Sequence, residues 1–184
     1  MNDFILFVGP MFGGKTTKLL STLDRYKYKR KNILAFKPNI DERYSKSDIV
    51  THRASTFPAI RIEHGSDILN HITSLNKYVI AVDEAFMIPD IGHTLIGLFK
   101  EGHTIVVSSL QLSSDFTPYE EIATMMPYAT RVEVCPAVCS LCESDAYYTV
   151  KIGGRSDHEI EVGGSEMYQP RCLKHFDADA ALEI

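Results

Sequence analysis

Residues 4–16 read FILFVGPMFGGKT, and this stretch decides the fold. Residues 4–8 are all aromatic or aliphatic, which is typical of a buried strand. The residues that follow fit the pattern G-x-x-x-x-G-K-[ST] and lead into a segment of helical length, so the pattern predicts a phosphate-binding loop between a strand and a helix. The loop residues are Gly9, Pro10, Met11, Phe12, Gly13, Gly14, Lys15 and Thr16.

Each part of this loop has a chemical use. Backbone N–H groups in a glycine-rich turn surround phosphate oxygens, and the positive end of the following helix strengthens the attraction. Lys15 supplies a charge to the terminal phosphates, and the Thr16 hydroxyl ligates Mg²⁺. A glycine turn without a ligand is the alternative interpretation, and the flanking strand and helix argue against it.

Short apolar runs recur along the chain, with segments of helical length between them. This alternation predicts an α/β fold, with a P-loop NTPase-like parallel β-sheet and flanking helices. The expected strands are 4–8, 33–36, 78–82 and 104–107, and the expected helices are about 16–30, 66–75 and 89–100.

The apolar run at 79–82 leads directly into Asp83 and Glu84. A buried strand followed by carboxylates resembles a Walker B motif. We expect Asp83 to hold Mg²⁺, directly or through water, and Glu84 to accept a proton from an attacking hydroxyl as the catalytic base. A solvated turn is the other interpretation of two acids at a strand end, and the phosphate-binding loop disfavours it.

The regular alternation stops after about residue 134. We therefore expect three parts, namely a nucleotide-binding domain at 1–134, a small lobe at 135–176 and an acidic, Ala-rich tail at 177–184.

The small lobe contains two residue pairs with metal-ligand spacing. Cys139 with Cys142 and Cys172 with His175 each enclose two residues, which suits one tetrahedral Zn²⁺. Four protein ligands leave no open position for water, so such a metal is structural. Cys135 and, more weakly, His158 compete for the fourth position, and a lobe without metal is the remaining alternative.

The composition of the 184-residue chain narrows the function classes. Lys and Arg number 19 against 24 Asp and Glu, and the net charge of −5 argues against nucleic acid as a partner over the whole surface. The basic run at 25–31 is assigned to a helix end, where cations offset the helix dipole. The run at 4–8 is too short for a signal peptide or a membrane span, so we expect a cytoplasmic protein with reduced thiols and no membrane partner.

Five stretches together carry a resemblance to a known family. They are 9–17 (GPMFGGKTT), 37–44 (KPNIDERY) followed by Thr51-His52, 83–89 (DEAFMIP), 110–119 (LQLSSDFTPY) and 159–168 (EIEVGGSEMY). In this order they resemble the type II thymidine kinases, with their GPMFSGKST loop, flexible loop after the second strand, D-E-[AG]-Q-F-F-P segment and lasso loop. Phe86 stands in place of the family's glutamine, and Gln111 and the spacing to Tyr119 depart from its pattern.

The resemblance implies an activity and its accessories. The reaction is transfer of the γ-phosphoryl group of ATP, with Mg²⁺, to the 5′-hydroxyl of thymidine or deoxyuridine, which gives dTMP from thymidine in pyrimidine deoxynucleotide salvage. The resemblance also implies a lasso loop closed at its base by structural Zn²⁺, feedback inhibition by dTTP, and a homotetramer with a dimer as the alternative.

The resemblance also assigns site residues. Asp41 and Arg43 join Asp83 near the phosphates of ATP. Tyr168 closes over the base, Met11 and Phe116 line an apolar pocket, and backbone groups of the lasso face the thymine edge. The implied nucleoside-binding residues are Met11, Phe116, Ile160, Glu161, Val162, Gly163, Gly164 and Tyr168.

Other functions stay open at this stage. An ATPase coupled to nucleic acid would use the basic run and the zinc lobe, but the acidic balance weighs against it. A non-catalytic module clasped by zinc would leave the phosphate-binding loop without a use. A kinase that acts on another nucleoside is the nearest rival. If backbone groups of the lasso recognise the base, few side chains in the sequence indicate which base is bound.

Overall fold

The computed structural model describes residues 2–41, 48–50, 55–73, 75–152, 164 and 166–176. Its centre is a six-stranded sheet in the order β5-β2-β6-β7-β1-β8, and every pairing in it is parallel. The strands are β1 (Phe4–Val8), β2 (Asn32–Pro38), β5 (Ile60–Ile62), β6 (Tyr78–Val82), β7 (Thr104–Ser109) and β8 (Arg131–Val134). The predicted parallel α/β sheet is confirmed.

The two edge strands of the sheet, β5 and β8, were not predicted. Their sequences, IRI and RVEV, alternate polar and apolar residues and are short. An edge strand has one partner and an exposed side, so it lacks the continuous apolar run of the central strands. The sequence pattern therefore identified the four central strands alone.

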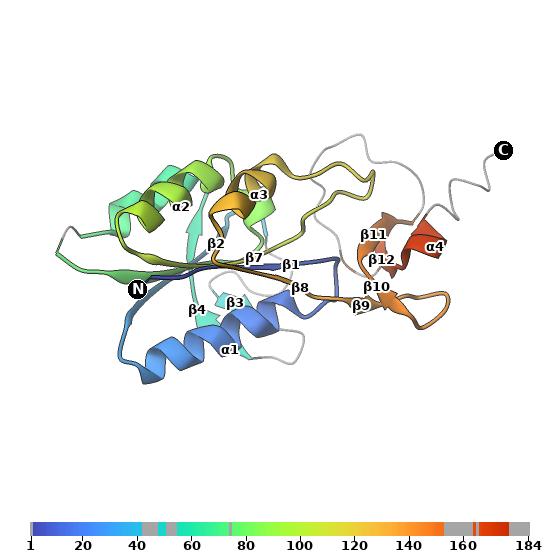
Figure 1. The fold of residues 1–184 in the computed structure, drawn as a ribbon, viewed down its shortest axis with the longest axis horizontal. Helices are drawn as coiled ribbons and strands as arrows, with labels where there is room; N and C mark the ends of the chain where they lie inside the picture. The colour runs from blue at the N-terminus through green and yellow to red at the C-terminus, as the bar shows by residue number, and fades with distance from the viewer. Residues whose placement is uncertain are drawn as a thin grey trace.

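Helices cover both faces of the sheet (Figure 1). On one face lie α1 (Lys15–Tyr28) and the antiparallel hairpin of β3 (Asp48–Val50) and β4 (Thr56–Pro58). The other face carries α2 (Ile91–Lys100), α3 (Glu120–Met125) and the 3₁₀ helices η1 (Gly65–His71), η2 (Ala85–Met87) and η3 (Met126–Tyr128). Phe4, Leu6 and Val8 pack in the core under α2 and α3, whereas Ile5 and Phe7 pack with α1. Both faces are buried, which explains the unbroken apolar runs.

Two expected helices differ from the observed ones. The segment predicted as a helix at 66–75 is the 3₁₀ helix η1, which ends at His71, and Ile72 is already extended. Asp67 Oδ2 accepts the backbone N–H groups of Glu63 and His64, a local turn contact that competes with regular α-helix. Helix α2 begins at Ile91 rather than residue 89, because Asp90 has a φ of 60°.

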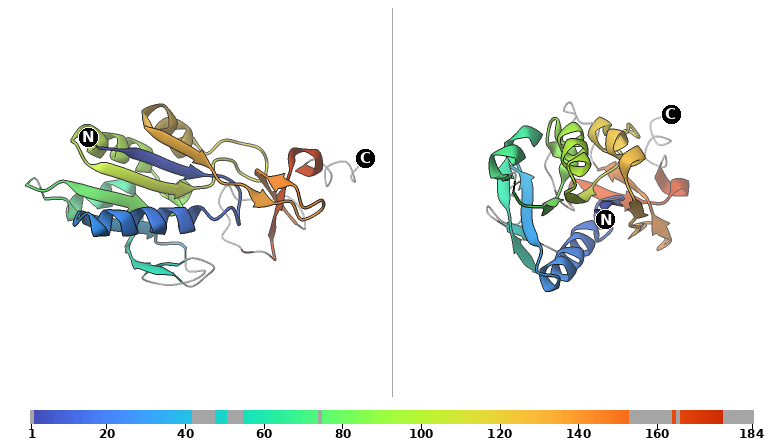
Figure 2. Two further views of the ribbon diagram at one scale, coloured as in Figure 1. Left: turned by 60° about the horizontal axis from the view of Figure 1, so that its bottom comes forward. Right: turned by 60° about the vertical axis from the view of Figure 1, so that its left-hand side comes forward.

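The small lobe lies beyond the carboxyl ends of the sheet strands (Figures 1 and 2). It contains two antiparallel strand pairs and a short helix. The elements are β9 (Ala137–Val138), β10 (Asp145–Ala146), β11 (Tyr148–Lys151), β12 (Tyr168–Arg171) and α4 (Leu173–Phe176). The tail expected at 177–184 falls outside the described residues.

Within the described ranges, no helix combines the length and the apolar character that a membrane crossing needs.

Candidate functional site

The phosphate-binding loop follows β1, and its glycines have distinct structural reasons. A β-carbon at Gly9 would lie 2.3 Å from the carbonyl oxygen of Cys135, and one at Gly13 would lie 2.4 Å from the same atom. Gly14 has open space around it but a φ of 73°, which favours glycine. The Cys135 N–H donates to the Val8 carbonyl at 2.7 Å, so the chain leaving β8 packs directly against the loop.

Lys15 and Thr16 open helix α1 at the loop. The Lys15 ammonium is buried and donates to the Pro10 carbonyl at 2.6 Å. The Thr16 hydroxyl lies 3.2 Å from Oδ1 and 3.4 Å from Oδ2 of Asp83. The structure therefore brings the predicted phosphate loop and the predicted Walker B carboxylate together, although 67 residues separate them in the sequence.

Asp83 and Glu84 follow β6. Burial, together with the charge of Glu84, raises the pKa of Asp83 to about 7, although hydrogen bonds from Ser108 and Thr16 and the charge of Lys15 lower it. Glu84 is half-buried and has a φ of 51°, a left-handed conformation that turns the chain into η2. A nearby cation favours the charged form of a buried carboxyl such as that of Asp83, as expected beside a bound Mg²⁺.

The end of β2, the neighbour of β6, carries further buried charges. Lys37 and Asp41 are both buried there. The Lys37 ammonium reaches the Asp48 carbonyl at 3.4 Å, and the Asp41 N–H donates to the Pro38 carbonyl at 3.2 Å. Arg43, expected near the phosphates, and Thr51-His52 lie outside the described residues.

The phosphate loop also contacts the small lobe. The Met11 N–H donates to the Thr149 hydroxyl on β11 at 3.0 Å. The Phe12 side chain and Cys172 pack against a small apolar cluster made of Ala137, Cys139 and Ala146. The loop thus has the sheet on one side and the lobe on the other.

The residues expected around the nucleoside lie on several elements. Phe116 is 43% exposed, has a φ of 64°, and packs against Tyr148 and Phe176 at ring-centroid distances of 5.0 Å and 4.3 Å. Tyr168 begins β12, and its N–H donates to the Gly164 carbonyl at 3.1 Å. The lasso residues 160–163 fall outside the described part of the chain.

Phe86, which departs from the family pattern, is a core residue. The centroid of its ring lies 4.6 Å from that of the Tyr119 ring, and its backbone N–H donates to the Ser109 hydroxyl at 3.0 Å. This position therefore contributes an apolar ring to the core rather than a polar side chain.

The four expected zinc ligands form one cluster at the base of the lobe. The donor atoms of Cys139, Cys142, Cys172 and His175 all lie within 4.8 Å of one another. Cys142 Sγ and Cys172 Sγ are 3.7 Å apart, and His175 Nδ1 lies 3.7 Å from Cys139 Sγ and 3.3 Å from Cys172 Sγ. A tetrahedral zinc site has S···S edges of about 3.8 Å and S···N edges of about 3.5 Å, from its bond lengths. The cluster is therefore consistent with structural zinc.

The electrostatics of Cys139 support a metal ligand. Burial raises the pKa of this thiol, but backbone hydrogen bonds from Cys172, Leu141 and Cys142 lower it, to a net value of about 5. Thiolate is the form that binds zinc. Cys135, the competing ligand, lies outside this cluster against the phosphate loop, and its thiol contacts the Glu133 carbonyl at 3.7 Å. His158 lies outside the described residues.

The family model described as thymidine kinase matches residues 2–176. The chain belongs to the thymidine kinase family. A thymidine kinase of Pyrobaculum aerophilum is 34% identical over 180 residues, covering 94% of this chain and 97% of that protein. The genome packaging NTPase B204 from Sulfolobus turreted icosahedral virus 2, in complex with sulfate, aligns at 17% identity and a TM-score of 0.40, over 60% of this chain and 65% of that chain.

Family membership confirms the predicted activity. The chain is an ATP-dependent thymidine kinase, and ATP and thymidine are its substrates. The individual site residues stay predictions, which the geometry above makes specific enough to test.

Sequence reasoning missed several residues that surround the family's phosphate loop. Cys135 supports the loop with its backbone, Thr149 accepts a loop N–H, and Ser108 donates to Asp83. None of them belongs to a spacing motif. Their only signal was position, since Ser108 ends an apolar run and Cys135 follows the last strand of the sheet.

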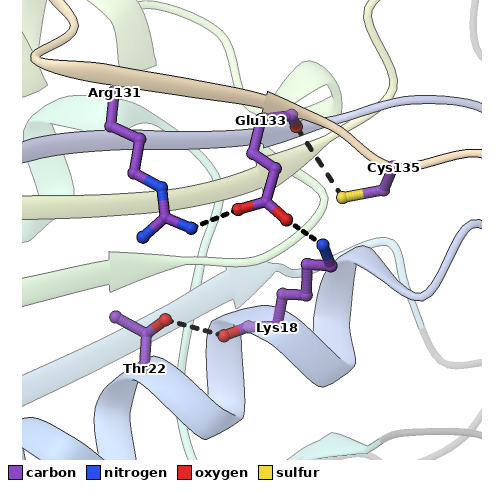
Figure 3. A network of polar contacts seen from close by, with 5 residues as sticks. All are labelled: Lys18, Thr22, Arg131, Glu133 and Cys135. Atoms are coloured by element: carbon purple, nitrogen blue, oxygen red, sulfur yellow. Dashed lines mark hydrogen bonds and ion pairs between the residues drawn. The ribbon is translucent and has the colours of Figure 1, made fainter.

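A polar network links helix α1 to the edge strand β8 behind the loop (Figure 3). Glu133 pairs with Lys18 of α1 and with its strand neighbour Arg131. The Thr22 hydroxyl donates to the Lys18 carbonyl at 2.8 Å. This network ties β8, and thereby Cys135, to the helix that carries Lys15 and Thr16.

Proposed function

We propose that this kinase transfers the γ-phosphoryl group of ATP to the 5′-hydroxyl of thymidine, and also of deoxyuridine, with Glu84 as the general base. The observation that carries the proposal is the contact of Thr16 with Asp83. It places the carboxyl end of β6 beside the phosphate loop, so Glu84 directly follows the carboxylate that faces ATP. A base in this position takes the proton of the attacking hydroxyl as the new P–O bond forms.

The donor side uses residues from the segments that follow three strands, β1, β2 and β6. Backbone N–H groups of residues 9–14 surround the phosphates, and Lys15 turns from the Pro10 carbonyl to the terminal phosphates. Thr16 and Asp83 would hold the Mg²⁺ that is bound with ATP, and the ion would supply positive charge beside the phosphates. Asp41 and Arg43 add contacts near the phosphates in this proposal. Catalysis is then mainly positioning and electrostatic stabilisation.

The acceptor side uses the small lobe. Met11 and Phe116 line the pocket for the base, Tyr168 closes over it, and backbone groups of residues 160–164 read the thymine edge. The four residues that would hold a structural Zn²⁺ are Cys139, Cys142, Cys172 and His175; their ligation would tie the ends of the lobe together and leave no open position for catalysis. In this division residues 1–134 bind ATP, and the lobe at 135–176 binds the nucleoside together with Met11 and Phe116 of the larger domain.

Further features of the family belong to the same proposal. They are inhibition by dTTP, assembly into a homotetramer or dimer, and a cytoplasmic location. A role in nucleic-acid-coupled ATP hydrolysis is disfavoured, because the family match covers nearly the whole chain, including the segment of the basic run.

A phosphoryl-transfer assay tests the proposal. Purified protein with Mg·ATP is given thymidine, deoxyuridine, deoxycytidine and deoxyguanosine separately, and the nucleoside monophosphate is measured. Selective conversion of thymidine and deoxyuridine supports the proposal. Conversion of another nucleoside instead would mean that the lasso recognises the base of that nucleoside rather than thymine.

The variant Glu84→Gln tests the base. We expect kcat to fall about 100-fold or more while Mg·ATP binding is retained, because the amide keeps the size of the side chain but cannot accept the proton. Glu120→Gln, at an exposed glutamate on α3, is the matched control and should keep the parent kcat. Near-normal turnover of Glu84→Gln would remove Glu84 from the base role.

A further inference from the structure

Two consecutive serines end β7, the strand that lies between β6 and β1 in the sheet. The register pairs Ser108 with Phe7 and Ser109 with Val8, directly before the phosphate loop. On the other side Val82 pairs with Val107, so the serines come level with the chain that leaves β6. They therefore stand between the phosphate loop and the two carboxylates.

Both serines are fully buried, with 0% exposure, in a strand whose neighbouring positions are Val and Leu. A buried hydroxyl costs free energy unless it forms hydrogen bonds, and alanine would fill nearly the same volume without that cost. The polar contacts of these hydroxyls are thus the physical reason for having serine here.

Ser108 acts on Asp83. Its hydroxyl donates to Asp83 Oδ1, the same oxygen that lies 3.2 Å from the Thr16 hydroxyl. Oδ2 lies 3.4 Å from the Thr16 hydroxyl. The carboxylate is held from the β7 side by Ser108 and from the loop side by Thr16, which fixes its rotation toward the phosphate loop.

Ser109 acts on the turn that carries Glu84. Its hydroxyl accepts the Phe86 N–H at 3.0 Å and donates to the Leu110 carbonyl at 2.9 Å, so its hydrogen-bonding capacity is used in both directions. Glu84 has a left-handed φ of 51°, a conformation that a non-glycine residue keeps only when its surroundings hold it. The Met87 N–H donates to the Glu84 carbonyl at 3.1 Å, and Ser109 holds the intervening Phe86 amide.

We propose that Ser108 and Ser109 are positioning residues of the phosphoryl-transfer site, Ser108 for the Mg²⁺-binding orientation of Asp83 and Ser109 for the turn that presents Glu84. The proposal rests on the roles given to Asp83 and Glu84 above. It assigns the two serines different effects, because one hydroxyl contacts a carboxylate and the other a backbone turn.

Ser108→Ala is tested by ATP binding without thymidine. Calorimetric titrations at a series of Mg²⁺ concentrations should show that the Mg²⁺ needed for half-maximal tightening of ATP binding rises about 10-fold, the usual effect of removing a hydrogen bond to a metal ligand. The control Ser21→Ala, at an exposed position of α1, should match the parent. An unchanged Mg²⁺ dependence in Ser108→Ala overturns the role of Ser108.

Ser109→Ala is tested by steady-state kinetics and by amide hydrogen exchange. We expect kcat to fall about 10-fold while the KM values for ATP and thymidine stay within about twofold, because the loss affects the geometry of the reacting group and not substrate binding. Amides of residues 86 and 87 should exchange faster than in the parent. A kcat equal to that of the parent overturns the role of Ser109. A rise in both KM values as large as the fall in kcat overturns it as well.

These measurements separate this proposal from the proposed function. If the parent protein does not convert thymidine, the acceptor assignment fails, while the Mg²⁺ titrations and the exchange rates still decide the two serines. Thermal unfolding of each variant defines the temperature at which all are folded, and the comparisons are made below it.

Discussion

The carboxyl end of the sheet and the small lobe build their sites by different means. At the sheet, Thr16, Asp83 and Ser108 come from three separate segments, and parallel strands bring them to one edge above a large apolar core. In the lobe, the buried apolar cluster consists of Ala137, Cys139 and Ala146, with Phe12 and Cys172 packed against it. A core this small needs a metal or another staple to be stable. The difference teaches that an extensive apolar core positions the residues at the edge of the sheet, whereas the lobe has few buried apolar residues and a Cys₃His cluster consistent with structural zinc.

The two regions meet at the phosphate loop, through Met11 on Thr149 and Phe12 in the lobe cluster. Variants that affect one region more than the other can therefore measure how independent they are.

Gly13→Ala should have the largest effect, because it changes the phosphate loop itself. The new β-carbon would lie 2.4 Å from the Cys135 carbonyl oxygen, a backbone atom, so the loop must move. A displacement of this kind costs about 100-fold or more in kcat/KM for ATP. Gly97→Ala is the control, since among the described residues no atom outside the adjacent turns of its own helix lies within 4 Å of the added β-carbon, and alanine favours helix α2. Retained ATP binding in Gly13→Ala would show that the loop does not need its contact with Cys135.

Cys172→Ser should break the lobe first. Loss of zinc is expected to raise the KM for thymidine about 10-fold, while the Kd for ATP changes by no more than about threefold, because the sheet keeps its own core. Metal analysis and both constants are measured on the same preparation. Cys135→Ala should retain the zinc, since Cys135 lies outside the cluster. Equal weakening of ATP and thymidine binding would mean that Phe12 transmits the lobe's state to the phosphate loop.

Asp83→Asn should make the fold more stable and the enzyme inactive. The pKa of Asp83 is raised from 3.8 to about 7, so between these values the folded chain binds more protons than the unfolded chain. The free energy of unfolding therefore falls as the pH rises through this window. Without ATP and Mg²⁺, we expect the Tm of Asp83→Asn to exceed that of the parent by several degrees at pH 8 and to match it near pH 4. Asp24→Asn, on the exposed side of α1, is the control. A Tm difference that does not grow with pH contradicts the burial argument.

Glu133→Gln should have the smallest effect. It removes the ion pairs with Lys18 and Arg131, whose side chains are 44% and 55% exposed. Exposed ion pairs contribute about 0–1 kcal/mol, and salt screens them. Urea unfolding at low and high salt should show a loss within this range that shrinks at high salt. A larger loss, independent of salt, would identify the network as a support of β8 and the phosphate loop.

The success of the sequence-based predictions followed the range of the interactions. The motifs at 9–16 and 83–84 could be predicted because each is local and each follows an apolar strand. The strands β5 and β8 could not be predicted, because edge strands lack a continuous apolar run. The helix expected at 66–75 is a shorter 3₁₀ helix, because Asp67 forms a local turn that periodicity does not report.

The sequence by itself indicated the family, the phosphate-binding loop, the acidic pair and the two ligand pairs Cys139 with Cys142 and Cys172 with His175, because these depend on residue type and short spacing; the structure places the competing Cys135 outside the cluster. Only the tertiary structure decided which carbonyl packs on Gly9 and Gly13, which hydroxyls contact Asp83, and where Phe12 packs. These contacts join segments that are distant in the chain. Their partners are set by the order of strands in the sheet and the register between them, which no local pattern encodes.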